Sequence, residues 1–98
     1  MIRHVVLFQW KPETSEGKIA EMFRELAGLK GKIPGLQQFE GGPYSSPEGL
    51  NQGFTHGFIM TFTDAASRNA YLPHPEHERV KALVGPNLQM VVAFDFEA

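Results

Sequence analysis

The order of hydrophobic patterns along the chain is the feature that most constrains its fold. Four segments have strand character, and helical segments separate the first from the second and the third from the fourth. The predicted strands are residues 2–10, 36–40, 54–63 and 88–97, and the predicted helices are about 15–29, 65–72 and 75–84. This β-α-β-β-α-β order predicts an α+β ferredoxin-like fold, with helices on one face of a four-stranded antiparallel sheet.

Capping and loop signals support these boundaries. Thr14 or Ser15 is suited to cap the first helix and Asp64 the second, while Pro75 suits the first position of the third. The segment 41–53 is rich in Gly, Pro and Ser, which predicts a loop. Because its length is at the limit of ordinary connections, we expect an arm over a neighbour or a lid over a pocket.

Composition limits the domain count and the partners. The 98 residues make one domain, 1–98, and a hydrophobic fraction of 42% is enough for a packed core. The chain has no cysteine, which excludes disulfides and sulfur metal sites. A net charge of −2 with dispersed Lys and Arg argues against nucleic acid. No apolar run is long enough to cross a membrane, so we expect a cytoplasmic protein without membrane partners.

Apolar residues occur on both faces of the predicted sheet. Alternation places Val5, Leu7 and Ile59 on the face opposite the helices, where a monomer would expose them to solvent. A second copy that packs sheet to sheet would cover this face. We therefore expect a homodimer formed through the sheet.

The segment 70–80 carries the polar groups best suited to chemistry. It is consistent with a helix junction, half of a metal site or the acid–base edge of a pocket. His74 lies between two prolines, where its side chain can cap the next helix. His74 and His77, with Glu76 and Glu78, offer nitrogen and oxygen ligands, but their spacing fixes no third ligand, so we predict no bound metal.

Alternation also predicts which side chains meet above the sheet. His4 and His56 share the parity of the aromatic positions in the two strands that we expect to pair centrally, so both should face the helices. Tyr71 ends the second helix, and His77 lies in the first turn of the third. The four side chains are therefore expected to converge on one cavity. Its expected apolar walls are Phe23, Leu26 and Phe58.

Each of these residues also has a structural interpretation. A strand histidine can be a core residue bonded to a backbone carbonyl, Tyr71 an ordinary core tyrosine, and His77 a solvated helix residue. In the functional interpretation, a neutral imidazole takes a proton from carbon or oxygen, and a phenol stabilises the charge that develops on a carbonyl.

The chain resembles the stress-responsive A/B barrel domains (Dabb), a branch of the dimeric α+β barrel superfamily. Five sequence elements along the chain carry this resemblance, and the Tyr-x-x-His-Pro-x-His element is the most specific. They are His4-Val-Val-Leu-Phe, Ile33-Pro-Gly, Gly53-Phe-Thr-His, Tyr71-Leu-Pro-His-Pro-Glu-His and Phe94-Asp-Phe. The resemblance implies a homodimer whose sheets face each other to form a barrel, with a cavity between sheet and helices in each subunit.

The same resemblance implies roles for single residues. A plant polyketide cyclase of this family uses a tyrosine and a histidine of this element for an intramolecular aldol cyclisation, without metal or cofactor. These catalytic roles fall on Tyr71 and His77. Leu26 replaces a pocket tyrosine of the cyclase, and Phe58 replaces a smaller valine. The implied substrate-binding residues are His4, His56, Phe23, Leu26 and Phe58.

Two main functions of different classes stay open, and a third lies behind them. The first is a cofactor-independent cyclase or isomerase that acts on a small apolar carbonyl compound. In it His77 is the base, Tyr71 stabilises the enolate oxygen, and His4 and His56 orient the substrate. The second is a non-catalytic protein, either a ligand-binding module or a stress-protective oligomer. Cofactorless oxygen chemistry, which the superfamily fold also supports, is a third. We expect no cofactor.

Overall fold

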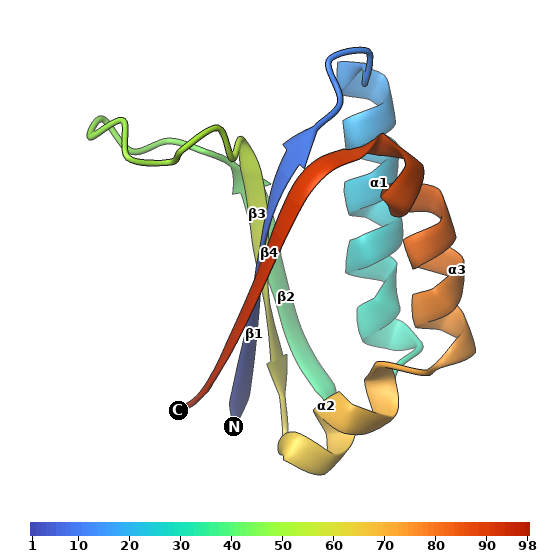
Figure 1. The fold of residues 1–98 in the computed structure, drawn as a ribbon. Helices are drawn as coiled ribbons and strands as arrows, with labels where there is room; N and C mark the ends of the chain where they lie inside the picture. Colours follow the sequence, from blue (N-terminus) through green and yellow to red (C-terminus); the bar gives the residue numbers. More distant parts are fainter.

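Four strands form one antiparallel sheet in the order β2-β3-β1-β4, in a computed structural model that describes residues 1–98. They are β1 (Ile2–Trp10), β2 (Leu36–Pro43), β3 (His56–Phe62) and β4 (Leu88–Glu97). Helices α1 (Glu16–Gly28), α2 (Ala65–Tyr71) and α3 (Pro75–Val84) all lie on one face of this sheet (Figure 1). The predicted ferredoxin-like fold is therefore confirmed, including the central pairing of β1 with β3.

Side-chain caps begin all three helices. Ser15, rather than Thr14, accepts the backbone N–H of Lys18 at 3.1 Å and starts α1. Asp64 accepts the N–H of Ser67 at 2.8 Å and starts α2. The Nδ1 atom of His74 accepts the N–H of Glu76 at 3.1 Å, which confirms the capping interpretation of this histidine. No helix combines the length and hydropathy that crossing a lipid bilayer would require.

The core lies between the helices and the inner face of the sheet. Even-numbered residues of β1 point into it, so that Val6 and Phe8 are buried while Leu7 is exposed. Met22 of α1 and Phe62 of β3 are fully buried there, and Tyr71 of α2 is almost completely buried. Burying one such side chain contributes about 1.5–3 kcal/mol, so this layer holds α2, and with it the segment after it, against the sheet.

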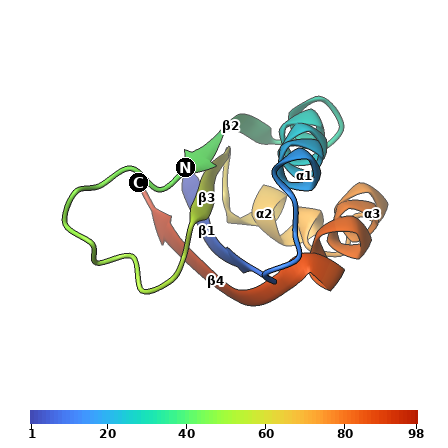
Figure 2. The same cartoon turned by 90° about the horizontal axis from the view of Figure 1, so that it is seen from above.

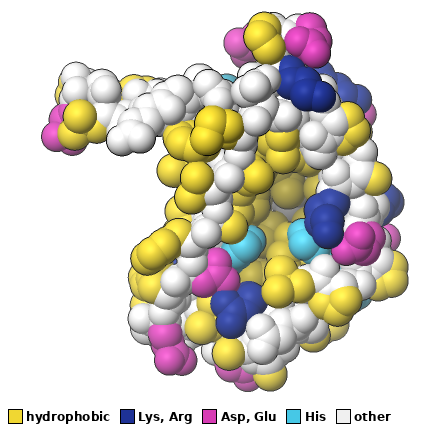
Figure 3. All heavy atoms as spheres, viewed as in Figure 1, with side chains coloured by type: hydrophobic (Ala, Val, Ile, Leu, Met, Phe, Trp, Pro, Cys, Tyr) yellow, Lys and Arg dark blue, Asp and Glu magenta, His cyan; other side chains and the backbone are white.

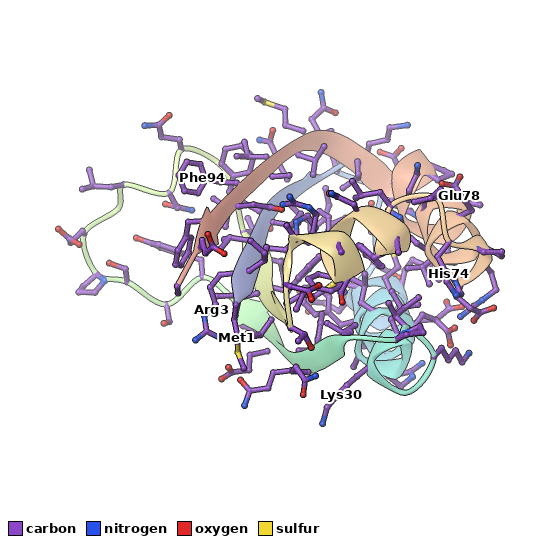
Figure 4. The ribbon with its side chains drawn as sticks, turned by 90° about the horizontal axis from the view of Figure 1, so that it is seen from below. Met1, Arg3, Lys30, His74, Glu78 and Phe94 are labelled. Atoms are coloured by element: carbon purple, nitrogen blue, oxygen red, sulfur yellow. The ribbon has the colours of Figure 1, made fainter.

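The helices leave strand β4 uncovered. Val91 lies on its inner face, opposite Phe8, and is still 51% exposed. Phe94 on its outer face is 65% exposed and points away from the helices (Figure 4). Leu7, Met90, Val92 and Phe96 extend the exposed apolar surface around Phe94. We call the exposed surface formed by Leu7, Met90, Val92, Phe94 and Phe96 the outer sheet face.

The connection between β2 and β3 differs from the prediction. Strand β2 continues to Pro43, and β3 begins at His56, so the connection is residues 44–55. Gly41 pairs with Phe58 inside the ladder, where an added Cβ would lie 2.8 Å from the Phe58 Cβ. Glycine therefore permits close strand contact here, although composition predicted a loop. Residues 44–55 form an arm that projects away from the helices (Figures 1 and 2).

Gly35 provides a test of how α2 is positioned. It has φ +83°, and a Cβ at this residue would lie 2.3 Å from the hydroxyl oxygen of Ser67 in α2. We predict that Gly35→Ala lowers the free energy of unfolding by about 1–3 kcal/mol or more, because it adds backbone strain and a clash. Chemical denaturation measures this change.

Gly28→Ala is the matched control. Gly28 has helical backbone angles, and an added Cβ would have no other atom within 4 Å of it. The control should raise the free energy of unfolding by up to about 1 kcal/mol, as alanine is the better helix former. Equal effects of the two substitutions would contradict the proposed contact between the 33–35 turn and α2.

Candidate functional site

An apolar cavity of about 410 Å³ lies between the sheet and α3. Strands β1 and β4 form one wall, and α2, α3 and the turn after α3 form the other. Eleven of its fifteen lining residues are hydrophobic, and the others include His4, His77 and Lys81. Figure 3 shows a hollow with hydrophobic walls and histidine side chains on two sides of it. The cavity exists because β4 extends the sheet beyond the helices.

Tyr71 and His77 form a stacked pair on the helix side of this cavity. Their ring centroids lie 4.1 Å apart with 30° between the ring planes. The Nδ1 atom of His77 lies 2.9 Å from the carbonyl oxygen of Leu72. Since a carbonyl can only accept, Nδ1 carries the proton and the lone pair is on Nε2. The backbone at the end of α2 therefore fixes the tautomer of His77.

The reactive atoms of this pair have no partner within the protein. Neither the Tyr71 hydroxyl nor the His77 Nε2 atom makes a hydrogen bond. Among side-chain nitrogen and oxygen atoms, only the Thr14 hydroxyl is both fully buried and without a hydrogen-bond partner. The Tyr71 hydroxyl and the His77 Nε2 atom therefore keep some exposed surface, and both residues line the cavity. Burial raises the pKa of Tyr71 and lowers the pKa of His77. Both side chains are therefore neutral near pH 7.

His4 lies on the sheet side and is bonded to Asp95. Its Nδ1 atom is 2.7 Å from Asp95 Oδ1, and Asp95 Oδ2 is 2.5 Å from Arg68 of α2. Burial by itself raises the pKa of Asp95, but the hydrogen bonds and charges of His4 and Arg68 bring it below its ordinary value. The carboxylate can then only accept, so His4 donates from Nδ1, and in the neutral form of the ring the lone pair is on Nε2.

Leu26 and Phe58 line the cavity, whereas His56 and Phe23 do not. His56 accepts a hydrogen bond from the Trp10 indole at 3.0 Å, and its ring is 5.8 Å from that of Phe23. It opens instead onto a second hollow at the base of the arm. The expected convergence of all these residues on one cavity is therefore not observed.

The strand register explains this difference. Met60 pairs with His4, and His56 pairs with Phe8, so the two histidines are four residues apart along the ladder. At roughly 3.3 Å per residue, this separates them by about 13 Å along the sheet. Parity placed both histidines on the inner face, but it could not show that they lie at opposite ends of it.

The structure also adds residues that the sequence did not indicate. Lys81 of α3 lines the cavity. Asp95 of β4 contacts the cavity residue His4, and Arg68 of α2 contacts Asp95. A signal for Asp95 was present, because it is an acidic residue between two phenylalanines of an apolar strand and has the inward parity. No group of three His, Asp or Glu side chains is arranged to hold a metal ion. His74 and Glu78, the other ligand candidates, lie on the outer side of the helices (Figure 4).

Known proteins resemble this chain over most of its length. A protein of Arabidopsis thaliana, the stress-response A/B barrel domain-containing protein HS1, is 31% identical over 96 residues, which is 98% of this chain and 88% of that protein. Olivetolic acid cyclase of Cannabis sativa is 25% identical over 76 residues, covering 78% of this chain and 75% of the cyclase.

Solved structures agree with these sequence relationships. The Arabidopsis thaliana protein At3g17210 superimposes with a TM-score of 0.95 at 31% identity, covering 100% of this chain and 95% of that one. A dimeric ferredoxin-like protein from Jannaschia sp. superimposes with a TM-score of 0.88 at 30% identity. The match covers 99% of this chain and 98% of that one. Hydroxynitrile lyase from Passiflora edulis has the same fold, with a TM-score of 0.90 at 22% identity. The match covers 97% of this chain and 90% of that one.

The family model for the stress responsive A/B barrel domain matches residues 2–98. This match includes every strand of the sheet and the whole Tyr71–His77 element. The chain therefore belongs to the stress responsive A/B barrel domain (Dabb) family.

Proposed function

We propose that this protein is a cofactor-independent acid–base enzyme of the cyclase or isomerase type, acting on a small, largely apolar carbonyl compound. The observation that carries the proposal is the stacked pair of Tyr71 and His77, whose free hydroxyl and free Nε2 both adjoin an apolar cavity. An apolar ligand displaces water from such a cavity, and there a few convergent polar groups have a large effect on a bound carbonyl.

The pair can perform proton abstraction next to a carbonyl. His77 Nε2 takes a proton from the carbon, the C–H electron pair moves towards the carbonyl oxygen, and the Tyr71 hydroxyl donates a hydrogen bond to that oxygen. The raised pKa of Tyr71 keeps the phenol protonated and able to donate. In a cyclase, the resulting enolate carbon attacks a second carbonyl of the same molecule, and His77 returns the proton to the new alkoxide.

The family relationship supports this reaction class. One relative of this chain is an olivetolic acid cyclase, and a protein of the same fold is a hydroxynitrile lyase. The cavity walls of this protein include Leu26 and Phe58, which are both apolar and buried. We assign His4 to the ligand site with them, and His56 and Phe23 to packing at the far end of the sheet.

A second candidate is a ligand-binding module without catalysis. The strongly apolar lining of the cavity favours it, because burial of an apolar ligand needs no reaction to be favourable. The relationship to stress-response proteins of Arabidopsis thaliana is compatible with such a role. Measuring binding and proton exchange separately distinguishes the two candidates.

We further propose that the protein is a homodimer formed through the outer sheet face. Related structures described as dimeric support this assembly. The exposed apolar side chains Leu7, Val92 and Phe94 belong to neighbouring strands and form one continuous surface. A patch of this kind is unusual on a monomer and typical of an interface between subunits.

The first prediction concerns catalysis with benzylacetone, an aromatic ketone with hydrogens on both carbons next to its carbonyl. We expect it to raise the melting temperature and to exchange those hydrogens for deuterium in D₂O, followed by proton NMR. His77→Gln and Tyr71→Phe should each lower the exchange rate about a hundredfold or more, the effect typical of removing an acid–base group.

The matched controls are Lys30→Gln and Tyr44→Phe, which alter residues outside the cavity. They should leave both binding and exchange unchanged. Binding that raises the melting temperature without any exchange would refute the enzymatic proposal and favour the binding module. Exchange that both site variants retain in full would show that another part of the protein is responsible.

The second prediction concerns pH. Burial is the main cause that lowers the pKa of His77 below the ordinary value of 6.5, so the folded protein favours the neutral imidazole. His77 should therefore titrate below pH 6.5 and stay available as a base at pH 7. Its contribution to folding stability should be present above pH 6.5 and be lost as the pH falls. NMR titration of its ring protons measures this, and a midpoint above 6.5 would contradict the buried site.

The third prediction concerns the dimer. Light scattering coupled to size-exclusion chromatography should give twice the chain mass of 10.9 kDa. Phe94→Glu places a charge on the outer sheet face and should shift the protein to a monomer. Val91→Glu, on the inner face of the same strand, should leave the dimer intact. A wild-type protein that elutes as a monomer would refute this assembly.

A further inference from the structure

Two charged residues, Asp95 and Arg68, hold His4, the second histidine of the cavity, in place. His4 comes from β1, Asp95 from β4 and Arg68 from α2, so three separate elements contribute to it. The contacts are 2.7 Å between His4 and Asp95 and 2.5 Å between Asp95 and Arg68. All three side chains are at least partly buried, with exposed fractions of 11%, 23% and 22%. Hydrogen bonds between charged groups are shorter and stronger than those between neutral groups.

We propose that Arg68 and Asp95 are positioning residues that make His4 a second proton-transfer group of the cavity. In this arrangement His4 is protonated on Nδ1 and presents the Nε2 lone pair to the ligand. The inference rests on the proposed function and deepens it, since it names a second base and restricts the class of substrate.

The carboxylate determines which nitrogen of His4 is available. Asp95 accepts the Nδ1 proton with one oxygen, and Arg68 occupies the other oxygen. The Nε2 atom of His4 has no partner in the protein and is not fully enclosed. When Nε2 takes a proton, the ring becomes a cation next to the carboxylate, which stabilises it, as in carboxylate–histidine pairs of hydrolases.

The site then has two bases on different walls. His77 lies on the helix side and His4 on the sheet side, and Tyr71 lines the same cavity, its ring centroid 6.0 Å from that of His4. The charges of the two histidines are near enough to affect each other, because His4 contributes to lowering the pKa of His77. A ligand in the cavity therefore has an accepting nitrogen on each side.

The step at His4 is a balanced proton transfer. A C–H bond of the ligand breaks, an N–H bond forms at Nε2, and the electron pair moves to the carbonyl oxygen near Tyr71. The reverse step returns the proton to carbon, so no oxidant or reductant is needed. Two bases suit a carbonyl compound with acidic hydrogens on both neighbouring carbons, and this is the substrate class that we infer.

The first part of the test needs no ligand. Nitrogen-15 NMR of the histidine side chains should show His4 of the wild-type protein as the Nδ1–H tautomer. Asp95→Leu removes the acceptor, and His4 should then shift towards the Nε2–H tautomer that a free histidine side chain prefers. Glu97→Gln, which removes an exposed carboxylate of the same strand, is the control and should change nothing. A His4 that keeps the same tautomer in Asp95→Leu would overturn the proposal.

The second part measures proton transfer with benzylacetone in D₂O. In a His77→Gln background, the remaining exchange should exceed that of buffer, and adding Asp95→Asn should lower its maximal rate about tenfold. The ligand concentration for half-maximal rate should stay nearly constant, because Asp95 does not touch the ligand. Arg68→Lys should retain most of the maximal exchange rate, and Arg68→Gln should lose it. These two variants test the same proposal if the Asp95 variants fail to fold.

The outcomes separate the two proposals. Exchange by the wild type that the Asp95 and Arg68 variants leave unchanged would overturn the role of His4 and leave the proposed function standing. If His77→Gln alone reduces the exchange to the buffer rate, the role of His4 is likewise overturned and the proposed function stands. A wild-type protein without any exchange would overturn the proposed function, and the proton-transfer role of His4 with it.

Discussion

The junction between α2 and α3 is the constraint on which the site depends. Two prolines frame it, and His74 between them caps α3, so the chain must turn sharply after Tyr71. The turn brings His77 back to the end of α2. There its ring stacks on Tyr71, and its Nδ1–H donates a hydrogen bond to the Leu72 carbonyl. Burial of Tyr71 in the core fixes the pair against the sheet. A short local motif thus sets both the position and the tautomer of the proposed base.

The second constraint is the mismatch in width between the two layers. The sheet has four strands, but the helices leave β4 uncovered. On the inner side this mismatch produces the cavity, which adjoins α3 and is lined by Val91 and Ala93. On the outer side it exposes the apolar surface that we assign to the dimer. One edge strand therefore connects the proposed ligand site with the proposed subunit interface, and Asp95 on that strand bonds to a cavity residue.

Local features could be predicted from the sequence, and features set by strand register could not. Alternation, caps and prolines depend on neighbouring residues, so the fold, the His74 cap and the positions of Tyr71 and His77 followed from them. Which residues face each other across the ladder depends on tertiary pairing. Parity therefore grouped His56 with His4, although they lie at opposite ends of the sheet, and gave no reason to join Asp95 to His4.

The most direct test of the proposed site is a crystal structure with benzylacetone bound. We expect the ligand to occupy the cavity between β4 and α3, with its carbonyl oxygen about 2.6–3.2 Å from the Tyr71 hydroxyl. The carbons next to the carbonyl should then face the Nε2 atoms of His77 and His4. A ligand bound in the hollow next to His56, or one whose carbonyl points away from Tyr71, would contradict the roles assigned to these three residues.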